Sequence, residues 1–255
     1  MLLRQIAGIS SAQIYADKDT KITDYTVNEL NTAVDRLANG EPVQYILGCC
    51  EFFGLDFKVR SGVLIPRPET EELVELILKD HRKEKIQLLD IGTGSGCIAV
   101  SLAKNLPEAR IFAWDISPTA LEIAAENALL NKVNIDLSKH DIREYETFTK
   151  DSRQWDVIVS NPPYVCESEI SEMEGHVLNH EPHLALFVKD EDPLIFYRII
   201  SEFALKTLKK GGCLYFEINS HLGEETVRLI QSYPFDSVRL FQDLSGRDRM
   251  IRAIL

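Results

Sequence analysis

The chain contains 255 residues, of which 45% are hydrophobic and 27% are charged. These proportions are typical of a folded globular protein, and they exclude a wholly disordered chain, a collagen-like repeat and a disulfide-stapled miniprotein. Lysine and arginine number 28 against 40 aspartates and glutamates, which gives a net charge of −12. Because sequence-independent binding to nucleic acid requires a basic surface, this acidic balance predicts no stable nucleic acid binding.

The five cysteines form neither a C-x-x-C pair nor a cluster with histidine. This pattern predicts free thiols in a reducing compartment and no structural metal site. The sequence has no run of 18 apolar residues and no recognisable signal peptide, so we expect a cytoplasmic protein without a membrane segment.

The first quarter of the chain contains two segments that differ in composition and in the spacing of their apolar residues. Residues 1–42 predict a small helical N-terminal domain, in which Leu30, Val34 and Leu37 recur at helical spacing. Residues 43–66 are richer in β-branched and aromatic residues and contain three glycines, which predicts a β-hairpin linker.

Helices and strands alternate from residue 67 to residue 255. Strands are predicted at 86–91, 110–115, about 134–138, 155–160, 212–218, 236–242 and 248–254, and helices at 70–80, 96–105, 117–131, 193–209 and 222–232, with a loop-rich segment at 161–192. This alternation indicates an α/β domain with a mainly parallel sheet that carries helices on both faces. No helix separates the last two strands, so we expect them to form an antiparallel pair at one edge.

A glycine-rich turn, Asp90-x-Gly92-x-Gly94-x-Gly96, follows the first strand of this domain. Glycine permits positive φ and a close approach of a ligand to the backbone, and the start of a helix attracts an anionic group. Dinucleotide-binding enzymes use G-x-G-x-x-G, which would require glycine where this chain has Cys97, so a nicotinamide dehydrogenase is disfavoured. The spacing instead resembles the first motif of S-adenosylmethionine-dependent methyltransferases.

Two acidic residues follow the next strands. Asp115 ends the second strand, where a carboxylate can accept hydrogen bonds from both ribose hydroxyls. Asp141 and Ile142 follow the third strand and could hold an adenine, with Asp141 accepting from its amine and Ile142 lying on its ring. An acidic residue at a strand end is also often only a helix cap, and Ile142 could belong to the core.

The strand at 155–160 runs directly into Asn161-Pro162-Pro163-Tyr164. Two consecutive prolines cannot continue a central strand, so Asn161 is expected at the strand tip beside the cofactor crevice. The Asn161 side-chain oxygen and the Pro162 carbonyl oxygen could accept both protons of a planar, unreactive nitrogen, and Tyr164 could stack on the planar group. Rate enhancement would then come mainly from positioning for in-line transfer. If this segment is considered without the other motifs, the alternative to such a binding site is a turn that only ends the strand.

With these motifs the chain resembles the HemK/PrmC group, the peptide chain release factor N5-glutamine methyltransferases. The resemblance covers at least residues 40–255. Its landmarks are Gly-Glu-Pro-Val-Gln-Tyr-Ile-Leu-Gly at 40–48, Phe-Phe-Gly-Leu-Asp-Phe at 52–57, Ile-Pro-Arg-Pro-Glu-Thr-Glu at 65–71, the glycine turn, Asn161 to Tyr164, Glu-Pro-His-Leu-Ala-Leu-Phe at 181–187 and Asp-Leu-Ser-Gly-Arg-Asp-Arg at 243–249. Residues 1–39 depart from it, because they are shorter than the family's usual helical domain.

The resemblance implies a seven-stranded, Rossmann-like class I methyltransferase domain, joined by a β-hairpin to a helical domain that docks the substrate. It implies S-adenosylmethionine as cofactor and, as substrate, the glutamine of the Gly-Gly-Gln motif of class I release factors. The implied cofactor contacts are Gly92, Thr93, Gly94, Ser95, Gly96, Asp115, Asp141, Ile142 and Asn161, and the implied glutamine site is Asn161, Pro162, Pro163 and Tyr164, with Asn161, Pro162 and Tyr164 in catalysis.

The main rival is an N6-adenine methyltransferase acting on DNA or RNA, because such enzymes share the Asn-Pro-Pro-Tyr chemistry. They must present a flipped base and hold phosphates, which the net charge of −12 disfavours. A non-catalytic binding protein with a degenerate site is a further alternative, but Asn161 and the three turn glycines are intact.

Overall fold

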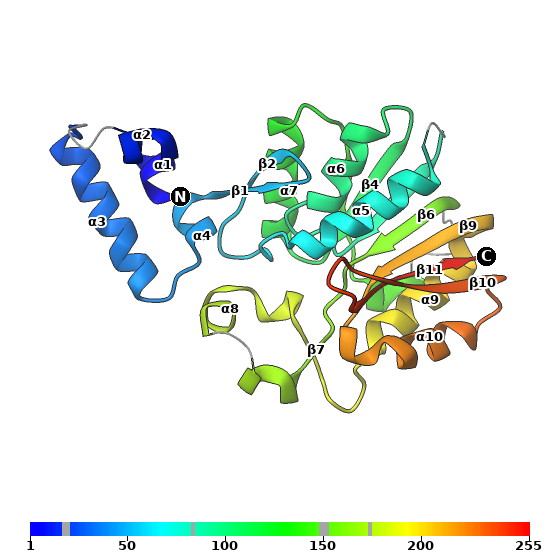
Figure 1. The fold of residues 1–255 in the computed structure, drawn as a ribbon. Helices are drawn as coiled ribbons and strands as arrows, with labels where there is room; N and C mark the ends of the chain where they lie inside the picture. Colours follow the sequence, from blue (N-terminus) through cyan, green and yellow to red (C-terminus); the bar gives the residue numbers. More distant parts are fainter. Residues whose placement is uncertain (17–20, 83–84, 148–152, 173–174) are drawn as a thin grey trace.

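A seven-stranded sheet forms the centre of the molecule (Figure 1). The computed structural model describes residues 1–16, 21–82, 85–147, 153–172 and 175–255. The sheet order is β10-β11-β9-β6-β3-β4-β5. Its strands are β3 (Gln87–Ile91), β4 (Arg110–Asp115), β5 (Asp136–Lys139), β6 (Trp155–Ser160), β9 (Leu208–Glu217), β10 (Ser237–Gln242) and β11 (Asp248–Ile254). Five strands pair in parallel, namely β3, β4, β5, β6 and β9. Strand β11 pairs antiparallel with both β9 and β10. The predicted antiparallel edge and the α/β class are therefore confirmed.

Helices cover both faces of the sheet. They are α5 (Pro68–Asp80), α6 (Cys97–Asn105), α7 (Pro118–Leu130), α9 (Ile195–Thr207) and α10 (Gly223–Gln231), with short 3-10 turns η1 (Ile142–Thr147) and η4 (Ser220–Leu222). Alternate strand residues enter two cores, since Leu88 packs with α5 and α6 while Leu89 packs with α9. This period of two is the geometric consequence of a strand buried on both faces.

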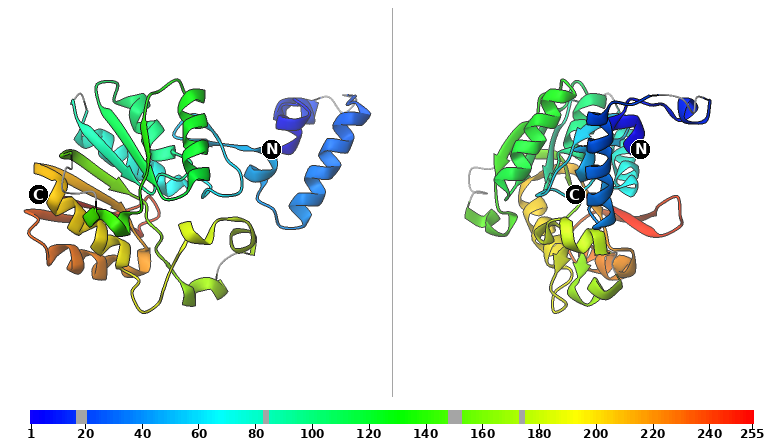
Figure 2. Two further views of the ribbon diagram at one scale, coloured as in Figure 1. Left: turned by 180° about the vertical axis from the view of Figure 1, so that it is seen from behind. Right: turned by 90° about the vertical axis from the view of Figure 1, so that its left-hand side faces the viewer.

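The described residues before the sheet domain form four helices, which lie to one side of that domain (Figures 1 and 2). They are α1 (Leu2–Ile6), α2 (Ser11–Ala16), α3 (Asp24–Ala38) and α4 (Val43–Leu47). The side chain of Thr23 caps α3, because its hydroxyl accepts a hydrogen bond from Thr26 N at 3.1 Å. Residues 43–47 were expected in the hairpin linker, and this expectation is wrong for them. They form a helical turn after Pro42, which Gly48 ends in the left-handed region at φ +71°.

The predicted hairpin itself spans β1 (Cys49–Phe52) and β2 (Leu55–Lys58), which pair antiparallel. Phe52 and Phe57 are buried against the same core as α5 and α6. On the side of α7, Asn127 donates to the carbonyls of Lys58 at 3.0 Å and Ser95 at 2.9 Å and accepts from Lys58 N at 2.7 Å. The hairpin is thus bonded to α7 and to the glycine turn by one buried amide.

Most element bounds predicted from the sequence lie within two residues of those observed. Strand β9 differs, because it begins at Leu208, opposite Trp155, and passes a register shift before Cys213 pairs with Val157. The loop-rich segment at 161–192 contains short elements, namely β7 (Val165–Cys166), η2 (Glu167–Glu172), α8 (Gly175–His180), η3 (His183–Ala185) and β8 (Phe187–Val188). Within the described residues, no helix has the length and apolar character needed to cross a membrane.

The central position of Asn127 generates a stability prediction. Asn127→Ala leaves three backbone groups of the hairpin and the glycine turn without their partner, and we expect a loss of about 3 kcal/mol in the free energy of unfolding. Urea unfolding measures this loss. Asn105→Ala removes one hydrogen bond at a helix end and serves as the matched control. Equal, small losses in both variants would contradict the role given to Asn127.

Candidate active site

The glycine turn links the carboxyl end of β3 to α6. Gly92, Gly94 and Gly96 have φ values of +75°, +54° and +80°. These angles let Gly92 N and Thr93 N both donate to the carbonyl of Trp114, at 2.8 and 3.0 Å. The turn is therefore held against the end of β4, the neighbouring strand, in a conformation that favours glycine.

Asp115 connects this turn to the loop after β4. Its Oδ2 accepts from Gly94 N and its Oδ1 accepts from Ser117 N, both at 2.9 Å. Burial raises the pKa of Asp115, and the backbone hydrogen bonds partly oppose that shift. A carboxylate has about four lone-pair positions, so the two oxygens retain acceptor capacity for further donors.

Asp141 and Ile142 stand at the end of β5. Arg143 donates to both carboxylate oxygens of Asp141, with a shortest distance of 2.6 Å, and this bonding lowers the pKa of Asp141. Ile142 packs in the core and also lines the pocket. Asp141 thus has an arginine partner that the sequence did not predict. Because its pKa is lowered, its carboxylate remains an acceptor of hydrogen bonds.

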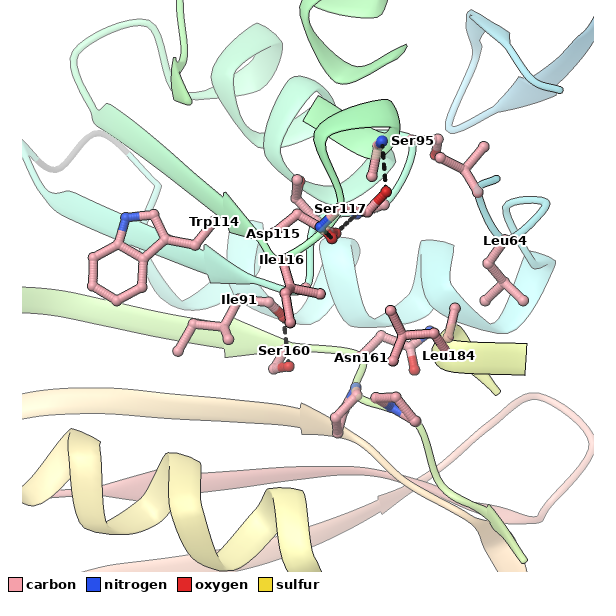
Figure 3. A pocket seen from close by; sticks show the side chains of 18 of the residues that line it. Leu64, Ile91, Ser95, Trp114, Asp115, Ile116, Ser117, Ser160, Asn161 and Leu184 are labelled. Carbon is pink, nitrogen blue, oxygen red and sulfur yellow. Dashed lines mark hydrogen bonds between the residues drawn. The ribbon is translucent and has the colours of Figure 1, made fainter. Parts of the chain in front are cut away.

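The loops after β3, β4, β5 and β6 enclose one pocket of about 310 Å³ (Figure 3). Ten of the predicted residues line it: Gly92, Thr93, Gly94, Ser95, Asp115, Asp141, Ile142, Asn161, Pro162 and Pro163. Leu184 and the segment around Leu64 also line the pocket, and both residues are labelled in Figure 3. The described residues contain no group of three or more His, Cys, Asp or Glu side chains that could hold a metal ion.

Two predicted residues lie outside this lining. Gly96 faces α7, where a Cβ would stand 3.0 Å from the Cβ of Ala124, so the packing of α7 favours glycine at this position. The hydroxyl of Tyr164 donates to Glu217 Oε1 at 3.1 Å. The stacking role given to Tyr164 stays a prediction.

Asn161 stands at the tip of β6. The residue before it, Ser160, donates from Oγ to the carbonyl of Ile91 at 2.7 Å, which ties the tips of β6 and β3 together. The Asn161 Nδ2 group donates to Thr70 Oγ1 at 3.4 Å. Asn161 is thus held at the pocket wall from the side of α5.

A buried polar cluster, defined here as Thr70, Tyr164, Glu217 and Arg249, lies behind Asn161. Glu217 is 1% exposed, and its Oε2 accepts from Thr70 Oγ1 at 2.6 Å. Burial raises the pKa of Glu217, whereas the Thr70 hydrogen bond and the positive charge of Arg249 oppose that shift. Sequence reasoning missed Glu217, although an acidic residue directly after the apolar run at 213–216 is an unusual pattern.

Two landmarks of the resemblance meet at a second buried carboxylate. Glu181 accepts from Ile65 N at 3.0 Å and from the guanidinium of Arg67 at 2.6 Å, and its side chain is fully buried. The segments at 65–71 and 181–187 are therefore bonded to each other. This contact brings both motifs to one side of the pocket, a relation that spacing along the chain does not show.

The packing of Gly96 generates a second prediction. Gly94→Ala and Gly96→Ala both place an alanine at positive φ, at a cost of about 1 kcal/mol. Gly96→Ala also crowds Ala124, and overpacking adds about 1–2 kcal/mol. We expect urea unfolding without added ligand to show the larger destabilisation for Gly96→Ala. The same loss in both variants would mean that α7 yields and that the contact is unimportant.

Two family models match parts of the chain. A family model described as "PrmC N-terminal domain" matches residues 1–48, and one described as "Methyltransferase small domain" matches residues 68–186. Residues 1–39 therefore belong to the resemblance, although the sequence alone did not include them.

Among solved structures, a methyltransferase from Pyrococcus furiosus is 17% identical, with a TM-score of 0.57 over 88% of this chain and 98% of that chain. A 16S rRNA N2 methyltransferase of T. thermophilus, solved with AdoMet and guanosine, is 16% identical, with a TM-score of 0.58 over 81% of this chain and 49% of that chain. At these identities the two structures show the fold alone, and they confirm the class I methyltransferase fold.

Curated relatives are much more similar. A protein named "Release factor glutamine methyltransferase" from Flavobacterium psychrophilum is 46% identical over 99% of this chain and 89% of its own length. A protein of the same name from Bacteroides thetaiotaomicron is 48% identical over 96% of this chain and 87% of its own length. The chain therefore belongs to the family of release factor glutamine methyltransferases.

Proposed function

We propose that this protein transfers a methyl group from S-adenosylmethionine to the side-chain nitrogen (N5) of the glutamine in the Gly-Gly-Gln motif of class I peptide chain release factors. The observation that carries the proposal is the position of the Asn161 carboxamide on the wall of the pocket that Asp115 and the glycine turn also line. The family membership of the chain supports the choice of substrate.

The pocket residues fit S-adenosylmethionine. The volume of the pocket, about 310 Å³, lies in the range of small-molecule sites. Asp115 has free lone pairs for two ribose hydroxyls, Asp141 offers an acceptor for an amine, and Ile142 and Ile116 give the wall an apolar surface. When bound, the cofactor supplies a methyl group activated by a sulfonium.

Asn161 and Pro162 would hold the glutamine amide. The nitrogen of an amide is a poor nucleophile, because its lone pair is delocalised. Acceptance of its two N–H protons by the Asn161 Oδ1 and the Pro162 carbonyl raises electron density on nitrogen and directs the lone pair at the methyl. Positioning then supplies most of the rate enhancement, with a smaller electrostatic share. As the C–N bond formed, the bond between the methyl group and the sulfonium would break, and S-adenosylhomocysteine would be left as the product of the cofactor. The amide proton would become acidic at that stage and would pass to solvent, so no base is needed before attack.

We further propose a division of labour along the chain. Residues 1–42 would dock the protein substrate, residues 43–66 would link, and residues 67–255 would carry the chemistry. Helix α3 buries only Ala33 and exposes Tyr25, Val34 and Leu37, which supports a surface for a protein partner. Translation termination is a cytoplasmic process, so the proposed function places the enzyme in the cytoplasm.

The rival substrate class is nucleic acid. The net charge of −12 opposes a phosphate-binding surface, and the relatives compared above are named for release factors. We therefore propose that the protein does not bind nucleic acid stably and that adenine is not its substrate.

Methyl transfer to a release factor is the direct test. We expect purified protein with S-adenosylmethionine to add one methyl group to a bacterial class I release factor, located by mass spectrometry on the glutamine of its Gly-Gly-Gln loop. The release factor with that glutamine changed to alanine is the matched control and should stay unlabelled. Labelling of DNA or RNA, with none of the release factor, would decide for the adenine alternative.

Replacement of Asn161 and replacement of Asp115 are expected to affect different steps, namely turnover and cofactor binding. Asn161→Ala removes an acceptor for the reacting amide, so turnover should fall about a hundredfold or more while cofactor affinity falls less. Asp115→Ala should chiefly raise the dissociation constant of the cofactor. Calorimetry and steady-state kinetics separate the two effects. An equal loss of affinity and turnover in Asn161→Ala would show that Asn161 mainly holds the cofactor, and an unchanged dissociation constant in Asp115→Ala would remove Asp115 from the site.

A further inference from the structure

The hydrogen bonds of the buried polar cluster have a fixed direction. Glu217 lies at the end of β9 with both carboxylate oxygens engaged, Oε2 by Thr70 at 2.6 Å and Oε1 by Tyr164 at 3.1 Å. The side chain of Arg249, 12% exposed, contributes a favourable positive charge to this carboxylate. A carboxylate only accepts hydrogen bonds, so the hydroxyl of Thr70 must donate to it.

The direction of this bond sets the next one. A threonine hydroxyl has one proton and two lone pairs. Since its proton is committed to Glu217, the Thr70 oxygen can only accept from Asn161. The 3.4 Å contact between Thr70 Oγ1 and Asn161 Nδ2 has this sense. The amino group of the carboxamide is therefore turned towards α5, and Oδ1 is the group left for a ligand.

The orientation matters because a carboxamide has nearly the same shape when its oxygen and nitrogen are exchanged. With Oδ1 free, the Asn161 side chain accepts from an N–H group, which a primary amide has and a carboxylate lacks. With Nδ2 free, the same side chain would donate, and would favour a carboxylate oxygen. One buried hydroxyl thus distinguishes two ligands that differ only in NH₂ against O⁻.

We propose that Thr70, fixed by Glu217, is a positioning residue that orients the Asn161 carboxamide and thereby makes the site select a glutamine side chain over a glutamate side chain. This inference rests on the proposed function, because it concerns the same acceptor residue. It assigns a role to the segment at 65–71, since Thr70 is 2% exposed and lines the pocket.

The experiment compares Thr70→Val, which removes the hydroxyl at nearly constant shape, with Thr70→Ser, which keeps it. Thr207→Val is the matched control, because Thr207 is a buried threonine at the end of α9 whose hydroxyl donates to the carbonyl of Phe203 at 2.9 Å. For each protein, calorimetry measures the dissociation constants of the cofactor, of a release factor with the native loop glutamine, and of the same factor with glutamine changed to glutamate. Kinetics measures kcat and KM for methyl transfer.

We expect the wild-type protein to bind the glutamine form of the release factor more tightly than the glutamate form. In Thr70→Val the ratio of the two dissociation constants should fall about tenfold, which is the effect of one orienting hydrogen bond. The kcat of Thr70→Val should fall by a similar factor, while its cofactor affinity stays within about twofold, because positioning rather than cofactor binding is lost. Thr70→Ser should restore most of both properties, and Thr207→Val should retain the wild-type preference.

Three results would overturn the inference: an unchanged glutamine preference in Thr70→Val, no recovery in Thr70→Ser, or a loss confined to cofactor affinity. Absence of a glutamine preference in the wild-type protein would also overturn it. A different result would contradict the proposed function alone: the wild-type protein binds the glutamine form preferentially but transfers no methyl group to it.

Discussion

The parallel register around β3 is the constraint on which the site depends. Ile91 pairs with Trp114 of β4 on one side and with Ser160 of β6 on the other. The residues that follow these three positions are Gly92, Asp115 and Asn161, so all three emerge at the same level of the sheet. A shift of one strand by a single residue would turn its side chains to the opposite face and would separate these groups.

The order of the strands explains why a crevice exists at this level. The chain passes from β3 outward to β4 and β5, then crosses back to β6 on the other side of β3. Successive connections therefore leave the sheet in opposite directions at β3, and ligands of open α/β sheets bind at such a point. The hydrogen bonds from Ser160 to Ile91 and from Gly92 to Trp114 close the crevice at its base.

Behind the crevice, buried carboxylates join segments that are far apart in the chain. Glu181 binds the backbone and guanidinium of the segment at 65–71, and Glu217 binds Thr70 of the same segment. A buried carboxylate without partners is costly, so each of these groups requires its donors to be present. This requirement accounts for polar residues of the segment at 65–71, since Arg67 and Thr70 donate to carboxylates that other segments contribute.

Local sequence patterns predicted the α/β class, the strands of the central sheet and the helices that cover it, because period-two and period-3.6 patterns, glycine turns and paired prolines act over a few neighbours. Together with the family resemblance, they also indicated ten of the residues that line the pocket. It did not reveal the helical turn at 43–47, where Pro42 and Gly48 outweighed a strand-like composition. The contact of Gly96 with α7, the hydrogen bond from the Tyr164 hydroxyl to Glu217 and the contact of Thr70 with Asn161 emerged from the folded structure alone. These contacts join residues 28 to 91 positions apart, and long-range hydrogen bonds depend on how layers pack, which no local pattern encodes.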